Sequence, residues 1–234
     1  MFSEGNDRNI LKPDVFRDTR RFGVRITWHG HSCFEIKDSK ILVIDPHDGY
    51  SVGLRKPDTT ADVVAVSHDH FDHNKADIVS GQETQVVTSS DGLSLPWLNI
   101  HGYDVCHDTK GGEVRGKNIM YKFTMDGITC LHMGDLGHII DTDLVEKIGH
   151  VDILFLPVGG TFTIDHKDAV SIMDLLKPTI TIPMHYRVPG ISLAIDEVKP
   201  FLKGAKLPVL KVGYAIDFIS EDLPDHQEIW LFNY

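Results

Sequence analysis

The sequence contains the stretch Ser67-His68-Asp69-His70-Phe71-Asp72-His73-Asn74, which holds three histidines and two aspartates within positions 68–73. The stretch follows directly on residues 61–66, an apolar run whose β-branched residues are typical of a buried strand. Polar side chains this dense at the end of a buried strand are either exposed on a loop or gathered around a cation. The spacing within the stretch favours the cation.

On an extended segment, His68 and His70 are two positions apart and leave the chain on the same face. Asp72 and His73 are adjacent, so their side chains leave in different directions. One short loop can therefore supply a histidine pair to one metal ion and an Asp–His pair to a second. Imidazole and carboxylate suit zinc, and also iron or manganese. We expect two divalent metal ions, with zinc as the first choice.

Three further segments lie in chain order around this loop: Trp28-His29-Gly30-His31-Ser32-Cys33-Phe34, Gly134-Asp135-Leu136-Gly137 and Pro183-Met184-His185-Tyr186. Together with the H-x-H-x-D-H pattern at 68–73, they resemble the metallo-β-lactamase fold superfamily. The sequence is similar in particular to the branch of small zinc-dependent hydrolases related to ascorbate-6-phosphate lactonase. The resemblance runs from about residue 25 to about residue 218. It is specific for fold and metal but not for substrate, because this fold carries many chemistries.

The order of predicted strands and helices indicates α+β layering. We predict strands at 24–28, 33–36, 41–44, 61–66, 85–88, 118–125, 128–132, 151–156, 179–182, 209–212, 215–219 and 229–232, and helices at 75–80, 142–148, 168–176 and 197–202. Residues 89–104 are expected to be irregular. The resemblance sharpens the fold to a four-layer αβ/βα sandwich with its site at the edge of the sheets. We expect one hydrolase domain at 23–234, preceded by an N-terminal extension at 1–22.

The resemblance also implies a set of metal ligands outside the loop. It implies that the first metal takes His68, His70 and His107, that the second takes Asp72, His73 and His185, and that Asp135 bridges both. His132, three residues before Asp135, is a rival to His107. It stands on an apolar strand, where a histidine is more often in the core or in support of a ligand. His101 is a weaker rival on an expected surface loop.

Four more residues are candidates for substrate contact or for support of the ligands: His31, Asp45, His132 and Thr161. His31 is favoured over His29 to face the site, although a structural role is equally open. Asp45 either holds a ligand histidine behind the loop or opens a turn. Thr161, with Asp165 and His166, can line the pocket, but a glycine turn followed by a helix capped by Asp165 is the simpler interpretation.

Composition limits the class of protein. The 234 residues carry a net charge of −11, from 34 acidic against 23 basic residues, so nucleic acid is a disfavoured partner, although a local basic groove remains open. No apolar run approaches the roughly 18 residues of a membrane span, and no secretory signal is visible. The three cysteines lack C-x-x-C spacing, which is typical of a reducing compartment. We expect a cytoplasmic protein with a small-molecule substrate; a homo-oligomer is open.

Two metals sharing a water lower the pKa of that water to about 7, and the bridging hydroxide attacks a carbonyl or phosphorus centre. Asp135 would position the hydroxide, and Asp72 would help to move protons. The expected function is a metal-dependent hydrolase acting on an ester-type substrate, a lactone or a phosphorylated sugar acid by analogy with the lactonase branch. The alternatives are a phosphodiesterase of the same fold, a non-catalytic metal-stabilised binding module, and redox chemistry at a di-iron site.

Overall fold

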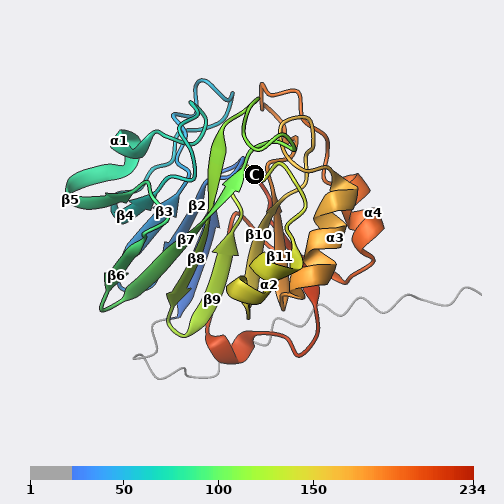
Figure 1. The fold of residues 1–234 in the computed structure, drawn as a ribbon. Coiled ribbons are helices and arrows are strands. Elements are labelled where there is room, and N and C mark those ends of the chain that lie inside the picture. Colours follow the sequence, from blue (N-terminus) through green and yellow to red (C-terminus); the bar gives the residue numbers. More distant parts are fainter. Residues whose placement is uncertain (1–22) are drawn as a thin grey trace, which may run out of the picture.

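Two β-sheets form the framework of the computed structural model, which describes residues 23–234 (Figure 1). The six-stranded sheet has the order β13-β1-β2-β3-β4-β5. Its strands are β1 (Val24–Trp28), β2 (Phe34–Lys37), β3 (Ile41–Ile44), β4 (Ala61–Ala65), β5 (Ser80–Val87) and β13 (Ala215–Phe218). The extension predicted at 1–22 lies outside the described residues.

The eight-stranded sheet has the order β12-β14-β11-β10-β9-β8-β7-β6. Its strands are β6 (Leu93–Leu95), β7 (Leu98–Cys106), β8 (Lys117–Met125), β9 (Ile128–His132), β10 (Ile153–Pro157), β11 (Ile180–Met184), β12 (Val209–Lys211) and β14 (Glu228–Leu231). The helices are α1 (Ala76–Val79), α2 (Thr142–Ile148), α3 (His166–Leu176) and α4 (Lys199–Ala205), with a 3-10 turn at Ser220–Asp222.

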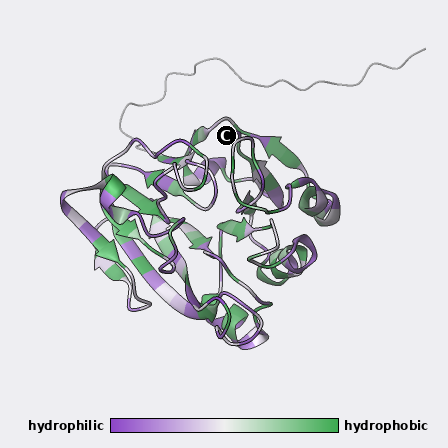
Figure 2. Ribbon diagram, turned by 90° about the horizontal axis from the view of Figure 1, so that it is seen from above, coloured by the Kyte–Doolittle hydropathy of each residue, from purple (hydrophilic) through white to green (hydrophobic). Residues whose placement is uncertain are grey.

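The main core lies between the two sheets. Phe34 of β2 and Phe155 of β10 meet across it, with ring centroids 4.6 Å apart. Strands and helices alternate in hydropathy along their length in Figure 2, as expected for elements that bury one face. β10 and β11 are buried along their whole length, because helices cover the outer face of this sheet. The predicted α+β sandwich is therefore confirmed.

The two outer layers differ in thickness. On the eight-stranded sheet, α3 buries an apolar stripe made of Ala169, Ile172, Met173 and Leu176, and α4 packs against α3. Asp165 caps α3 by accepting hydrogen bonds from two backbone N–H groups, as the simpler interpretation of this segment predicted. On the other sheet, the single turn α1 covers a small apolar cluster that includes Val64 and Val79. No described helix is long and apolar enough to cross a membrane.

The prediction of an irregular segment at 89–104 is wrong. This segment forms β6 and most of β7, which pairs along its length with β8. Leu98, Ile100 and Gly102 are buried while Asn99 and His101, which alternate with them, are exposed, so this part of the strand has the usual alternation. Its glycine and polar residues conceal that alternation in the sequence. The helix predicted at 197–202 starts later, at Lys199, because proline is tolerated in the first helical turn but not further along.

Strand directions place many loops at one edge. β3, β4 and β5 are mutually parallel, and so are β9, β10 and β11. β1 runs in the direction of β3, and β7 in that of β9, because each is separated from it by one antiparallel neighbour. The carboxyl ends of these strands therefore open towards the same edge, the usual place for a site in sheets of this kind.

Candidate metal centre

Loops after six strands carry polar residues to this edge. They place His31 after β1, Asp45 after β3, His68 to His73 after β4, His107 after β7, Asp135 after β9 and His185 after β11. Except for the partly exposed His70 and the exposed Asp69 and Phe71 of the β4 loop, these residues are buried. Buried charged and imidazole groups are rare unless they are paired or bind a metal.

Asp135 lies at the centre of the histidines. Its Oδ2 atom is 3.2 Å from Nε2 of His107 and 3.2 Å from Nε2 of His185. Its Oδ1 atom is 3.3 Å from Nε2 of His73, and Oδ2 is 3.9 Å from Nε2 of His68. One carboxylate thus touches histidines from both of the ligand sets that the sequence predicted, which is the geometry that a bridging ligand needs.

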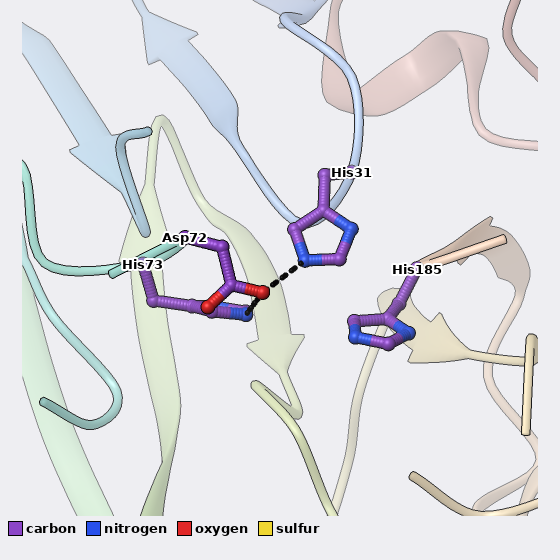
Figure 3. A group of neighbouring side chains, drawn as sticks. All are labelled: His31, Asp72, His73 and His185. Atoms are coloured by element: carbon purple, nitrogen blue, oxygen red, sulfur yellow. Dashed lines mark hydrogen bonds and ion pairs between the residues drawn. The ribbon is translucent and has the colours of Figure 1, made fainter. Parts of the chain in front are cut away.

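The candidate ligand atoms form three groups, in each of which all atoms lie within 4.8 Å of one another. One of them, Asp45 with His68 and His73, shares a histidine with each of the other two groups. The first group, here called the first half-site, is His68, His70 and His107. The second group, here called the second half-site, is His31, Asp72, His73 and His185 (Figure 3). The first coincides with the predicted first set, and the second adds His31 to the predicted second set.

Among residues 23–234, several atoms at the centre lack a partner with the geometry of a hydrogen bond. They are Nε2 of His68, His73 and His185, and Oδ1 of Asp135, all of them inaccessible to solvent. Buried polar atoms almost always have a partner, so a cluster of unpartnered donors and acceptors needs an explanation. Imidazole nitrogens and carboxylate oxygens that converge in this way fit divalent metal ions such as zinc, manganese or iron.

Asp45 connects the two half-sites from behind. It accepts hydrogen bonds from the Ser67 backbone N–H at 2.7 Å and from Ser67 Oγ at 2.7 Å. Its Oδ2 atom also lies 2.9 Å from Nδ1 of His73, while Ser67 Oγ lies 2.9 Å from Nδ1 of His68. Both carboxylate oxygens are thus engaged, and both histidines are held with Nε2 towards the centre. This is the arrangement expected of a residue that orients ligands.

His132 has no free nitrogen for a metal. Its Nε2 atom donates to the Ser32 carbonyl at 2.9 Å, and its Nδ1 atom accepts from the Gly134 N–H at 3.2 Å. It fixes the turn that carries Asp135. Asn118, which the sequence analysis missed, supports the same turn by accepting a hydrogen bond from the Asp135 backbone N–H at 2.9 Å.

His31 faces the centre, and His29 does not. The ring of His31 lies 4.3 Å from that of His185, and its Nε2 atom is 3.1 Å from Oδ2 of Asp72 (Figure 3). His29 lies on the other side of the turn, with Nε2 3.5 Å from a carboxylate oxygen of Glu35.

Left-handed backbone conformations cluster at this edge. His31, Asp45 and His185 have φ values of 53°, 50° and 52°. Such values cost free energy in a residue other than glycine, and they persist only where the surrounding structure enforces them. The backbone is therefore strained at three of the loops that carry the site.

The protonation states also suit a cation. Burial, with His185 nearby, lowers the pKa of His31 to about 3, and burial with His73 nearby lowers that of His68 to about 3. Burial opposes ionisation of Asp135, but His185 and His73 outweigh it and hold the pKa of that carboxyl well below its usual range. Burial likewise opposes a charge on His73, but carboxylates, Asp135 first, raise its pKa above normal. A metal ion would take the place of that proton.

Thr161 and His101 lie apart from the cluster. Thr161 is exposed, with a φ of 60°, and belongs to neither half-site. His101 is exposed on β7. The sequence analysis missed Ser67 although it directly precedes His68; only the three-dimensional contact with Asp45 reveals its part.

Similarity to known proteins agrees with this geometry. A family model described as the β-lactamase superfamily domain matches residues 25–185. A UPF0173 metal-dependent hydrolase from Pyrococcus furiosus is 30% identical over 223 residues, which cover 83% of this chain and 99% of the relative. A candidate zinc-dependent hydrolase of the metallo-β-lactamase superfamily from Thermotoga maritima has a TM-score of 0.74 and 33% identity, covering 89% of this chain and 98% of that one.

A diiron β-hydroxylase from Streptomyces venezuelae shares the fold alone, at a TM-score of 0.57 and 16% identity, with 79% of this chain and 50% of that chain covered. The Pyrococcus and Thermotoga relatives, together with the histidine-rich edge, place the chain in the class of metal-dependent hydrolases. Within that class, the chain belongs to the β-lactamase superfamily.

Proposed function

We propose that this hydrolase uses two divalent metal ions, zinc being the first expectation, to cleave an ester-type substrate such as a lactone or a phosphorylated sugar acid. The observation that carries the proposal is the position of Asp135, which lies within 3.3 Å of His73, His107 and His185. The names of the Pyrococcus and Thermotoga relatives support metal-dependent hydrolysis. The substrate type rests on the resemblance to the lactonase branch.

The proposed ligands follow the two half-sites. The first metal would be held by His68, His70 and His107, the second by Asp72, His73 and His185, and Asp135 would bridge them. Bound there, the ions would supply a shared water of lowered pKa and a positive field for the negative charge that develops during attack.

The chain's own residues would prepare the reaction. Asp45 and Ser67 fix His73 and His68 in one orientation, so little reorganisation is needed. Asp72 is buried, which opposes its ionisation, but His73 and His31 keep its pKa below the usual range. As an ionised carboxylate 3.1 Å from His31 Nε2, Asp72 would accept a hydrogen bond from that imidazole, which fixes the orientation of the carboxylate.

Metal analysis and turnover test this proposal together. Protein purified without added metal would be assayed for metal content, stripped with a chelator, and reloaded with zinc, manganese or iron. Each form would be given a sugar-acid lactone, its phosphorylated derivative and a phosphodiester. We expect two ions per chain and metal-dependent cleavage of a lactone. Cleavage of the phosphodiester alone would favour the phosphodiesterase, and iron with O₂ consumption would overturn the hydrolytic mechanism.

The non-catalytic alternative needs its own comparison. His68→Ala would be matched with His101→Ala, which removes an exposed histidine outside the half-sites. We expect His68→Ala to lose one ion and nearly all turnover, while His101→Ala keeps both. A parent protein that binds metal tightly, loses stability on His68→Ala, and cleaves none of the three substrates would be a metal-stabilised binding module.

A further inference from the structure

A wide groove lies between α3, α4 and the segment 187–197, outside the metal centre. Its volume is about 970 Å³, within the range of pockets that hold small organic ligands. None of its lining residues belongs to either half-site. It is therefore a second concave surface, separate from the proposed catalytic residues.

The groove is basic in an acidic protein. Lys167, Lys199, Lys203 and Arg187 line it, against two carboxylates, whereas the whole chain has a net charge of −11. One of those carboxylates, Glu197, is shared between Arg187 at 3.3 Å and Lys199 at 3.5 Å.

Two lysines of the groove form no ion pair with a described carboxylate. Among the described residues, neither Lys167 nor Lys203 has a carboxylate within 4.0 Å. The charge of Lys167 still acts on the carboxylates of Asp165 and Asp168, so Lys203 is the lysine of the groove that carries unneutralised positive charge, which attracts anions.

The floor of the groove is apolar. Val170 of α3 and Pro200 of α4 line it, together with Gly204. A Cβ atom at Gly204 would lie 3.3 Å from Cγ2 of Val170, so glycine keeps the two helices in close approach. A ligand that fits both features has an anionic group for the lysines and an apolar body for the floor.

The wall of the groove is hydrogen-bonded to the edge that carries the metal centre. The Arg187 N–H donates to the Asp196 carbonyl at 2.7 Å, and the Asp196 N–H donates to the Gly159 carbonyl at 2.8 Å. Arg187 follows His185 by two residues. A ligand in the groove would therefore touch the same segments that end at the metal centre.

We propose that the groove between α3 and α4 is a binding site for a small amphipathic organic anion, a carboxylate or a phosphate ester with an apolar tail. The site stands independently of the proposed hydrolysis. The charge surplus favours an anion over a neutral apolar ligand, and the apolar floor favours an organic anion over inorganic phosphate.

Fluorescent and alkyl probes test the site. The intact protein would be titrated with 8-anilinonaphthalene-1-sulfonate, followed by displacement with octanoate, octyl phosphate and neutral octanol. We expect one saturable site, displaced by the anions at least about tenfold better than by the alcohol and weakened by salt. The stronger of the two anions identifies the head group. Equal displacement by octanol, or binding without saturation, would overturn the proposal.

Variants locate the binding. The double variant Lys199→Glu/Lys203→Glu should lower the affinity for the probe about tenfold or more. The matched charge reversal Lys206→Glu, just beyond α4 and outside the groove, should change that affinity less than twofold. Val170→Trp, which fills the groove, should also remove binding and covers the case in which the double variant fails to fold. Equal weakening by Lys206→Glu would contradict a defined site. Sedimentation would show whether the protein is a dimer. A dimer that Lys199→Glu/Lys203→Glu converts to a monomer would mean that the groove binds a second copy of the chain instead of a small ligand.

Discussion

The two half-sites of the metal centre are built in different ways. The second half-site is buried throughout and contains two residues with left-handed backbone, His31 and His185. In the first half-site, by contrast, His70 is partly exposed, and none of its three residues has a positive φ. The neighbouring Phe71 has 49% of its surface exposed.

This difference indicates a division of labour. A rigid, enclosed half-site suits an ion that stays bound and orients its partners, because its ligands need no rearrangement. An accessible half-site suits the approach of a substrate. We therefore infer that the substrate enters over His70 and that the ion of the second half-site is held more tightly. The predictions below test this contrast, the residues that hold the halves together, and one residue outside both halves.

The largest effect is expected from Asp135→Ala. It removes the only described carboxylate that lies within 4.0 Å of histidines in both half-sites, so both ions should be weakened at once and turnover should fall by about three orders of magnitude or more. Metal content and kcat/KM would be measured beside Asp174→Ala, an exposed position on α3. A variant that keeps two ions and half of the parent's activity would show that Asp135 is not the bridging ligand.

Acidification should weaken the second half-site through His47. This buried side chain contacts the His29 carbonyl through Nε2 and accepts from the Gly49 N–H through Nδ1, so it supports the turn before His31 in its neutral form. Burial lowers its pKa to about 4, whereas the unfolded chain titrates near 6.5.

The unfolded state therefore binds one more proton between these two pH values, and the folded protein loses stability as the pH falls from 6.5 to 4. The loss amounts to at most about 3 kcal/mol. Urea unfolding of the metal-free protein at several pH values, compared with His47→Asn, measures it. The variant should lose this part of the pH dependence; an identical slope in both proteins would mean that His47 plays no part.

A comparison of Asp45→Asn with Ser67→Ala should distinguish metal binding at the two half-sites. Asp45 orients His73 directly and His68 through Ser67, so Asp45→Asn should weaken both ions by about 10–100-fold. Ser67→Ala removes the link to His68 and one hydrogen bond to Asp45, but it leaves the contact between Asp45 and His73, so it should weaken the first ion more than the second. Calorimetric titration of the stripped proteins with zinc would resolve the two sites. Equal loss from both sites in Ser67→Ala would show that the halves are not independent.

The smallest effect is expected from Thr161→Ala. Thr161 is exposed and lies outside both half-sites, so metal binding and turnover should stay within about twofold of the parent. A change in KM alone, measured on the substrate found active, would return Thr161 to the substrate pocket.

The fold class and the elements of regular pattern could be predicted from the sequence, and the helix at 142–148 has the predicted bounds. Asp141 caps this helix by accepting a hydrogen bond from the Leu144 N–H, and such a cap is a local interaction that a sequence can reveal. β7 was missed because Gly102 occupies an inward position where the alternation needs a large apolar side chain, so the pairing with β8 is what stabilises the strand.

The candidate site divides in the same way. The spacing of residues 68–73 identifies them as candidate metal ligands, and the resemblance implied His107, Asp135 and His185. The parts of Ser67 and Asn118 depend on contacts between distant segments, which no local pattern reveals. The predicted cytoplasmic location and homo-oligomer stay predictions.

The metal centre belongs to neither sheet alone, since its residues come from β1, β3 and β4 in one sheet and from β7, β9 and β11 in the other. A growing chain can thus offer only fragments of the cage until β11 has been synthesised and docked. An ion held by residues of both half-sites would therefore require that the two sheets have closed on each other.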